Sequence, residues 1–534
     1  MSLQSLSLRG QAEWVLLLAV FLAALGIRAY DLSVLAAFPD ELTYISRAVH
    51  IIGLNGAWSR VDMWDQPPLF TYILAAVIGT VGGTLNSLRL VSVFAGSATV
   101  VIAYFLGRSM YGKVAGFVAA SALAVDGFDV LYSRLLYIEA VSCMLILAAT
   151  FFFYEGIVKK RDLKMTLVGG IFFGLALDSK YIALVMAVAL IFFLVVYRKR
   201  LGAGFPRKET LVFFGVAVAV LVPVIIALAV ANANPLYYDL VQRFQLNKVQ
   251  AVAGQLKSGA IFVAGYERFI QAFFHISSTN PFGVYPPIAI QIPVWTILVS
   301  AALLFFLASF LLRRNPADGL LFILLLAFLA FALTYPAKRN YFALYPSLMF
   351  FIMMGRLTQL SVDYLRSHYG RKEMYRILSI GMIFLTVSAI ALNALSVPAM
   401  YKNGFGDWDE TYPIMTYIGQ NSGNDTLVAT TLVVFGFYIQ QLGINASVTT
   451  LKQAAALYSE PISNYSMLTP VKGQYPIYWV ISPAAIQKEH PQFIVISKGD
   501  YLTTTEAFRQ YINQNYYQPL DTKLILLFQM KPGS

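Results

Sequence analysis

Two adjacent carboxylates, Asp40 and Glu41, lie in the stretch FPDELTYISRA, ten residues after the first apolar segment ends. Charged side chains near a bilayer are costly to accommodate and mostly serve function. A structural explanation is that Asp40, which follows Pro39, caps a helix. A chemical explanation is that one carboxylate is a general base, which its neighbour orients or assists by binding a cation. The position of the pair predicts chemistry on the membrane face reached after one crossing.

Three more charged residues occupy ends of apolar segments on that same face. Arg134 and Glu139, in LYSRLLYIEA, either snorkel toward the interface or add a basic and an acidic group to the same site. Lys180, in LALDSKYIAL, lies in a short turn, where it pairs with Asp178 or binds a lipid phosphate.

A basic pair, Lys338 and Arg339, precedes several tyrosines in TYPAKRNYFALYP. Arginine can hold a phosphate through two parallel hydrogen bonds. Tyr341 and Tyr345 suit the wall of a sugar or isoprenoid site, although aromatic belts at a membrane interface are equally expected.

Metal ligands are sparse in the sequence. The four histidines are scattered and the single cysteine has no partner, so a zinc site made of His or Cys is not expected. Glu41, Glu139, Glu267 and His275 could still assemble one. The sequence therefore predicts no definite cofactor and leaves a divalent metal ion open.

The elements that position these residues are membrane helices. The 534-residue chain is 58% hydrophobic and 12% charged, whereas soluble domains carry about 25% charged residues. Repeated apolar runs of about 20 residues predict a polytopic α-helical membrane protein. We expect about eleven spans, near residues 12–30, 86–107, 114–128, 140–158, 165–178, 181–197, 211–231, 291–312, 318–334, 340–356 and 377–397.

Basic residues cluster in alternate connections between these spans. Because cytoplasmic loops carry the excess of Lys and Arg, the N-terminus is predicted inside and the C-terminus outside. The apolar segment 67–83 would reverse this order if it crossed, so we interpret it as a re-entrant or juxtamembrane helix on the outer face. The net charge of +12 does not indicate nucleic acid, because residues 1–399 carry +13 and residues 400–534 carry −1.

Two domains follow from this pattern. Residues 1–399 form the predicted membrane domain, with a first external loop at 31–85 that contains juxtamembrane helices and a long external loop at 232–290. Residues 400–534 alternate short β-type runs with helical patterns, which predicts a small extracytoplasmic α/β domain without a glycine-rich phosphate loop.

Several of these motifs occur in an order and sidedness that resemble the GT-C glycosyltransferases, above all the protein O-mannosyltransferases and the aminoarabinose transferases. They are the external Asp-Glu pair, the PPL segment at Pro67, SRLLYIE at 133–139, the SKY turn at 179–181 and the basic-aromatic stretch before Tyr-Pro. Two departures are Gln66, where the family often has His or Lys, and a C-terminal domain unlike the β-trefoil of eukaryotic protein O-mannosyltransferases.

The resemblance implies a GT-C-like membrane fold and the transfer of mannose, or a similar hexose or pentose, from a polyprenyl-phosphate donor. The acceptor is a protein or a glycolipid on the extracytoplasmic face, and a single displacement inverts the sugar. The resemblance implies that Asp40 and Glu41 are catalytic. The expected phosphate ligands are Lys180, Lys338, Arg339 and Arg134, and the expected substrate contacts are Glu139, Tyr44, Tyr181, Tyr341 and Tyr345.

Two alternatives remain at this point. A transporter or flippase of a lipid-linked glycan would need polar groups and broken helices near mid-membrane, whereas the charges singled out here lie at outer span ends. A non-catalytic membrane scaffold would use the C-terminal domain for binding.

Overall fold

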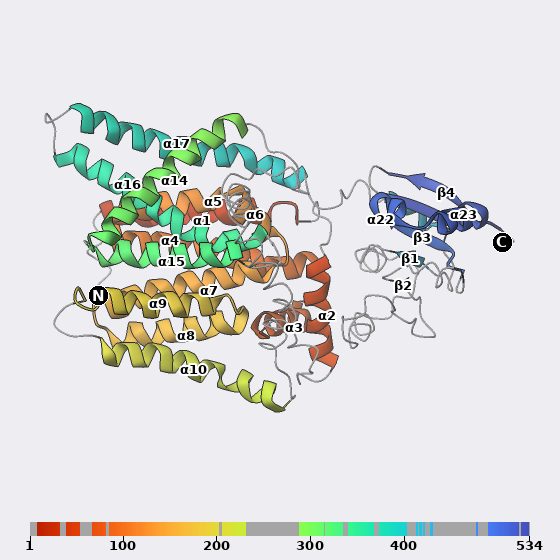
Figure 1. The fold of residues 1–534 in the computed structure, drawn as a ribbon, viewed down its shortest axis with the longest axis horizontal. Helices are drawn as coiled ribbons and strands as arrows, with labels where there is room; N and C mark the ends of the chain where they lie inside the picture. Colours follow the sequence, from red (N-terminus) through yellow and green to blue (C-terminus); the bar gives the residue numbers. More distant parts are fainter. Residues whose placement is uncertain are drawn as a thin grey trace, which may run out of the picture. The chain divides into compact units, whose positions relative to one another are not determined.

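The computed structural model contains long helices and a small mixed sheet (Figure 1). Up to Lys402 it describes residues 8–32, 39–53, 67–81, 85–201, 206–230, 288–313, 315–334, 340–367 and 373–402. Beyond Lys402 it describes residues 413–414, 416–418, 420–421, 428–430, 477–478, 487, 490–522 and 525–532.

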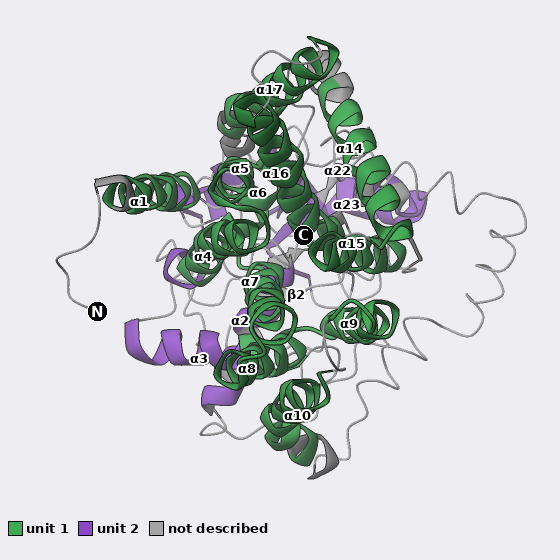
Figure 2. Cartoon of the chain, turned by 90° about the vertical axis from the view of Figure 1, so that its left-hand side faces the viewer, with its two compact units in different colours: residues 1–30, 63–70, 89–400 green, residues 31–62, 71–88, 401–534 purple. Residues whose placement is uncertain are grey.

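The chain divides into two compact units (Figure 2). One comprises residues 1–30, 63–70 and 89–400, and the other comprises residues 31–62, 71–88 and 401–534. The first unit holds most of the long apolar helices. The second holds helix α2 (Pro39–Gly53), most of helix α3 (Leu69–Val81) and the C-terminal sheet.

Each predicted span coincides with a helix of the described chain. These helices are α1 (Leu8–Ala29), α4 (Leu85–Tyr111), α5 (Lys113–Ala124), α7 (Ile138–Phe153), α8 (Leu163–Ser179), α9 (Ala183–Tyr197), α10 (Arg207–Val230), α14 (Ile288–Leu311), α15 (Pro316–Thr334), α16 (Leu344–Ser367) and α17 (Glu373–Lys402). Helix α8 packs against both α7 and α10.

Six of the described helices are long and apolar enough to cross a bilayer. A seventh crossing results if α5 and the following α6 (Gly127–Arg134), which meet at a bend of 58°, count as one span. Helix α3 is 13 residues long, fewer than the roughly 20 that a crossing needs, and α9 and α15 also contain shorter apolar stretches. The prediction of a polytopic helical membrane protein is confirmed, and the number of eleven spans stays a prediction.

Local sequence determines where several helices begin. Asp162 precedes α8, and its carboxylate accepts hydrogen bonds from the backbone N–H groups of Lys164 (2.8 Å) and Met165 (3.3 Å). This satisfies two donors that have no partner within the helix. Gly112 precedes α5 with a φ of 114°, a conformation that costs glycine little and other residues much more.

Glycines allow α5 to approach both α4 and α16 closely. A Cβ atom on Gly116 of α5 would lie 2.6 Å from the carbonyl oxygen of Tyr104 in α4. A Cβ atom on Gly355 of α16 would collide with the carbonyl oxygen of Ala115. One turn along α16, Gln359 Oε1 accepts from the backbone N–H of Ala115 at 3.3 Å. Helix α16 therefore both packs against α5 and caps its N-terminus.

The C-terminal part contains a five-stranded sheet in the order β2-β1-β3-β5-β4. Its strands are β1 (Val428–Thr430), β2 (Ile477–Tyr478), β3 (Phe493–Ser497), β4 (Tyr516–Asp521) and β5 (Ile525–Met530). Strand β1 runs parallel to β2 and β3, whereas β5 is antiparallel to β3 and β4. The predicted C-terminal α/β structure is therefore present.

One face of this sheet forms a core with helix α23 (Glu506–Asn515). Ile494 pairs with Phe528 across β3 and β5, and Phe508 and Ile512 of α23 pack in the same cluster. Alternate strand residues point to one face, so these side chains are buried together. Burial also raises the pKa of the Tyr516 phenol above its usual range. Short helix α22 (Lys498–Thr503) follows β3.

Candidate functional site

The predicted catalytic pair lies in the first turn of α2, which begins at Pro39. Proline suits the start of a helix, and the positive end of the helix dipole stabilises nearby carboxylates. Consecutive helical residues point about 100° apart, so the two carboxylates have different surroundings. Glu41 is fully buried, whereas Asp40 is half-buried. Asp40 is therefore the more accessible carboxylate, and Tyr44, one turn later, is buried.

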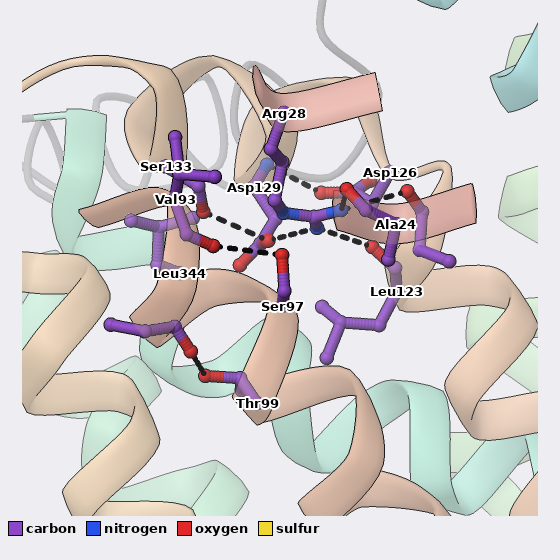
Figure 3. A network of polar contacts seen from close by, with 12 residues as sticks. Ala24, Arg28, Val93, Ser97, Thr99, Leu123, Asp126, Asp129, Ser133 and Leu344 are labelled. Carbon is purple, nitrogen blue, oxygen red and sulfur yellow. Dashed lines mark hydrogen bonds and ion pairs between the residues drawn. The ribbon is translucent and has the colours of Figure 1, made fainter. Parts of the chain in front are cut away.

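A buried ion pair connects the end of α1 with α6 (Figure 3). Arg28 Nη2 lies 2.5 Å from Asp129 Oδ1, and the guanidinium donates to the carbonyl oxygens of Leu123 and Ala124, each at 3.0 Å. Those carbonyls end α5, so Arg28 stabilises that helix terminus. Asp126 accepts from the backbone N–H of Asp129 at 2.9 Å and caps α6. The network fixes the bend between α5 and α6 and thereby the position where α6 ends.

Arg134 is the last residue of α6 and is fully buried. Its guanidinium donates to the carbonyl oxygens of Ile27 at 3.2 Å and Arg28 at 3.3 Å, and also to that of Tyr30. A cation at the C-terminal end of α1 is favoured by the helix dipole. The side chain therefore points into the protein and does not snorkel toward solvent.

Lys180 and Glu139 form a buried ion pair across 41 positions of sequence. Glu139 lies in the first turn of α7, and Lys180 is the C-cap of α8. The Glu139 side chain is fully buried and only 11% of the Lys180 side chain is exposed. The ion-pair partner of Lys180 is therefore Glu139, and not its sequence neighbour Asp178.

Aromatic rings surround this pair. Lys180 Nζ lies 4.6 Å from the ring centroid of Tyr341 and 5.2 Å from that of Phe342, within the range of cation–π attraction. The Tyr341 ring contacts those of Tyr132 and Tyr137, with centroids 6.0 and 5.8 Å apart. The structure thus brings together Glu139, Lys180 and Tyr341 from three separate segments of the chain.

The other predicted residues lie in different places. Tyr345 is fully buried in α16, and Tyr181 is half-buried directly after Lys180. Lys338, Arg339, Glu267 and His275 lie outside the described residues.

Sequence reasoning overlooked Arg28, Asp126 and Asp129, which hold α6 in place. In the sequence, Arg28 stands at the end of an apolar run, Asp126 lies inside a predicted span and Asp129 lies just beyond that span. These charges in and beside apolar segments were the signal that could have identified the network.

No group of three or more His, Cys, Asp or Glu residues that could hold a metal ion occurs among the residues that the structure describes. Of the four metal candidates, Glu41 is buried in the first turn of α2 and Glu139 contacts Lys180, whereas Glu267 and His275 fall outside the described part of the chain. What the Lys180 site offers chemically is a buried cation, an adjacent carboxylate and an aromatic wall.

Comparison with known proteins supports a glycosyltransferase fold. Residues 65–233 match the family model of dolichyl-phosphate-mannose-protein mannosyltransferase, a segment that includes Arg134, Glu139 and Lys180. A comparison of the sequence with curated proteins finds no match. The crystal structure of ArnT from Cupriavidus metallidurans bound to undecaprenyl phosphate is similar, with a TM-score of 0.57 at 12% identity over 98% of both chains.

A second similar structure is the archaeal oligosaccharyltransferase AglB from Archaeoglobus fulgidus, in complex with an inhibitory peptide and a dolichol-phosphate. Its TM-score is 0.56 at 13% identity, over 95% of this chain and 73% of AglB. The chain therefore shares the fold of ArnT and AglB. This shared fold agrees with the resemblance carried by the sequence motifs, and the long apolar helices of the described chain indicate a multi-pass membrane protein.

Proposed function

We propose that this protein transfers a sugar, mannose or a similar hexose or pentose, from a polyprenyl-phosphate donor to an acceptor protein or glycolipid. The reaction takes place on the extracytoplasmic face, with the N-terminus in the cytoplasm and the C-terminal domain outside, as the distribution of Lys and Arg indicates. The GT-C fold supports this reaction class. Two structures with that fold, ArnT and AglB, contain undecaprenyl phosphate and dolichol-phosphate.

The observation that carries the proposal is the buried cation at Lys180. Basic residues on the outer side gain nothing from the anionic lipids of the cytoplasmic leaflet. The Lys180 ammonium nevertheless lies at the end of α8, almost enclosed, against the ring of Tyr341. A phosphate attached to a membrane-embedded isoprenoid is an anion expected at this height. Lys180 also lies within the segment that matches the mannosyltransferase family model.

The reaction needs a base for the acceptor hydroxyl and positive charge for the departing phosphate. Asp40, the more accessible carboxylate of its pair, takes the proton of the acceptor hydroxyl. The oxygen then attacks the anomeric carbon, the bond between that carbon and the phosphate oxygen breaks, and polyprenyl phosphate leaves. Glu41 is the second carboxylate of the proposed catalytic pair. A single displacement inverts the configuration of the sugar.

The remaining predicted residues receive supporting roles in this proposal. Lys180, together with Lys338 and Arg339, stabilises the phosphate charge that develops as the bond breaks. Arg134 adds a further positive charge. The sugar and the isoprenoid contact Glu139, Tyr44, Tyr181, Tyr341 and Tyr345. Should a divalent metal ion take part, Glu41, Glu139 and His275 are its proposed ligands.

The proposal is tested by incubating the purified protein in liposomes with polyprenyl-phosphate-linked hexoses or pentoses that carry a label in the sugar. Label should appear in a protein or a glycolipid. Movement of the labelled donor across the bilayer without any transfer would instead support a flippase and would rule out the proposed enzyme.

Asp40→Asn should lower the transfer rate by about 10²–10⁴-fold, the usual contribution of a general base. The amide has nearly the same size but cannot accept the proton. Asp162→Asn, at the N-cap of α8, is the matched control and should retain transfer. Near-normal turnover of Asp40→Asn, in protein that elutes and unfolds like the wild type, would disprove the role of Asp40 as the base.

A further inference from the structure

The ammonium group of Lys180 already has a counter-ion in this structure, the carboxylate of Glu139. A phosphate that binds Lys180 would therefore arrive beside another negative charge. Two anions a few ångströms apart repel each other strongly in a partly buried setting, because little water screens them. The carboxylate and the phosphate thus compete for one cation.

We infer that Glu139 is the resting counter-ion of Lys180, and that the donor phosphate exchanges with it when the donor binds. The inference rests on the proposed function and deepens it, since it assigns a control of donor binding and release to Glu139. The Lys180 ammonium moves from one oxygen anion to another, and no covalent bond changes.

The two partners differ in mobility in the way that this exchange requires. Lys180 lies just past the helical part of α8, in extended backbone with φ −155° and ψ 136°, and its charge sits on a flexible four-carbon side chain. Glu139 lies within the first turn of α7 and is fully buried. The lysine is therefore the group that moves, while the carboxylate stays in place.

The Glu139 carboxylate and the Lys180 ammonium are both still stabilised by other groups after the exchange. The N-terminal end of α7 favours a carboxylate at Glu139, because unpaired backbone N–H groups point toward it. The rings of Tyr341 and Phe342, with centroids 4.6 and 5.2 Å from Lys180 Nζ, attract the ammonium without competing for its hydrogen bonds. These rings thus stabilise the cation in either position.

The exchange has a consequence for turnover. A carboxylate that competes for Lys180 weakens the binding of the polyprenyl phosphate left after transfer. Glu139 then recaptures the lysine as the product leaves, and the site returns to its resting state. Glu139 would thus lower the affinity for the donor and speed the release of the product.

The test measures the binding of undecaprenyl phosphate, without sugar or acceptor, to the purified full-length protein in lipid nanodiscs. Glu139→Gln should bind it about tenfold more tightly and release it more slowly, because a charge close to the phosphate is lost. Glu139→Asp keeps the charge but shortens the side chain, so its affinity should fall between those of the wild type and Glu139→Gln.

The matched control is Glu155→Gln. Glu155 is a buried carboxylate with lysine partners on the same continuous helical segment, 16 residues further along, or about 24 Å at 1.5 Å per residue. Its replacement should leave undecaprenyl phosphate binding unchanged. Thermal unfolding of each variant checks that it is folded.

Equal or weaker binding by both Glu139 variants would overturn the exchange. If the wild type binds undecaprenyl phosphate and the Glu139 variants bind no more tightly, the exchange fails and the proposed function stands. If the wild type does not bind undecaprenyl phosphate at all, the proposed function fails with it.

Discussion

The helical segment that begins with α7 carries a buried carboxylate near each end, and the two are neutralised in different ways. At one end, Glu155 in the π-helical turn η3 (Tyr154–Lys159) contacts Lys159 at 2.9 Å and Lys160 at 2.6 Å. Those lysine side chains are 40% and 53% exposed. At the other end, Glu139 has Lys180, whose side chain is 11% exposed and lies against aromatic rings.

The comparison shows that one type of ion pair can serve two purposes. Water screens the lysines around Glu155, and either lysine alone can neutralise the carboxylate. These ion pairs therefore anchor a helix end with little desolvation of the lysines. Lys180 is almost enclosed, so its charge interacts strongly with whichever anion is nearest. Of the two arrangements, the second is the one to which the proposed function assigns the donor phosphate.

The largest expected effect comes from Lys180→Met. Removing one partner of a buried ion pair leaves an uncompensated charge, which costs about 3–5 kcal/mol of unfolding free energy. We expect a strong loss of stability in detergent and a loss of sugar transfer, measured by denaturant unfolding and by the labelled-donor assay. A variant as stable as the wild type would show that the Glu139 carboxylate does not depend on Lys180.

A smaller effect is expected for Tyr341→Leu. The ring lies 4.6 Å from Lys180 Nζ, and a desolvated cation–π contact contributes about 2 kcal/mol. Because the ring stabilises the cation with either anion, leucine should lower the unfolding free energy by about 2 kcal/mol, measured by denaturant unfolding. Tyr341→Phe keeps the ring and should unfold nearly as the wild type does. If phenylalanine costs as much stability as leucine, the hydroxyl and not the ring is the important group.

The smallest effect is expected for Lys160→Met. Its side chain is more than half exposed, and Lys159 still neutralises Glu155, so the cost should be about 0–1 kcal/mol. Denaturant unfolding at low and high salt measures this difference. A cost comparable to that of Lys180→Met would remove the distinction between the two ends of the segment.

The sequence predicts the helices well because a span requires a long apolar run, and such runs are local. The strands Phe493–Ser497 and Ile525–Met530 are likewise apolar runs, which indicate β structure locally. Strand β4, YYQPLD, carries no such signal, because it is polar and contains a proline. Its place at the edge of the sheet, beside β5 alone, explains why such a sequence is tolerated.

The site is harder to predict because its contacts are not local. Lys180 and Glu139 were both singled out by the sequence, but their pairing depends on how α7 packs against α8. The Arg28–Asp129 pair was missed for the same reason, since its residues are 101 positions apart. Sequence identifies groups that are unusual for a membrane segment, and packing decides which of them meet.

The close approach of α5 and α16 also bears on how the protein is made. Ala115 and Gln359, which join the two helices, are separated by 244 positions. At about 5–20 residues per second, a ribosome needs roughly 12 to 50 s to synthesise that interval. During this time the first turn of α5, including the Ala115 N–H group that later donates to Gln359, has no contact with α16. Because α5 packs against the earlier helices α1 and α4 as well, the docking of α16 onto α5 is the late step in completing this part of the bundle.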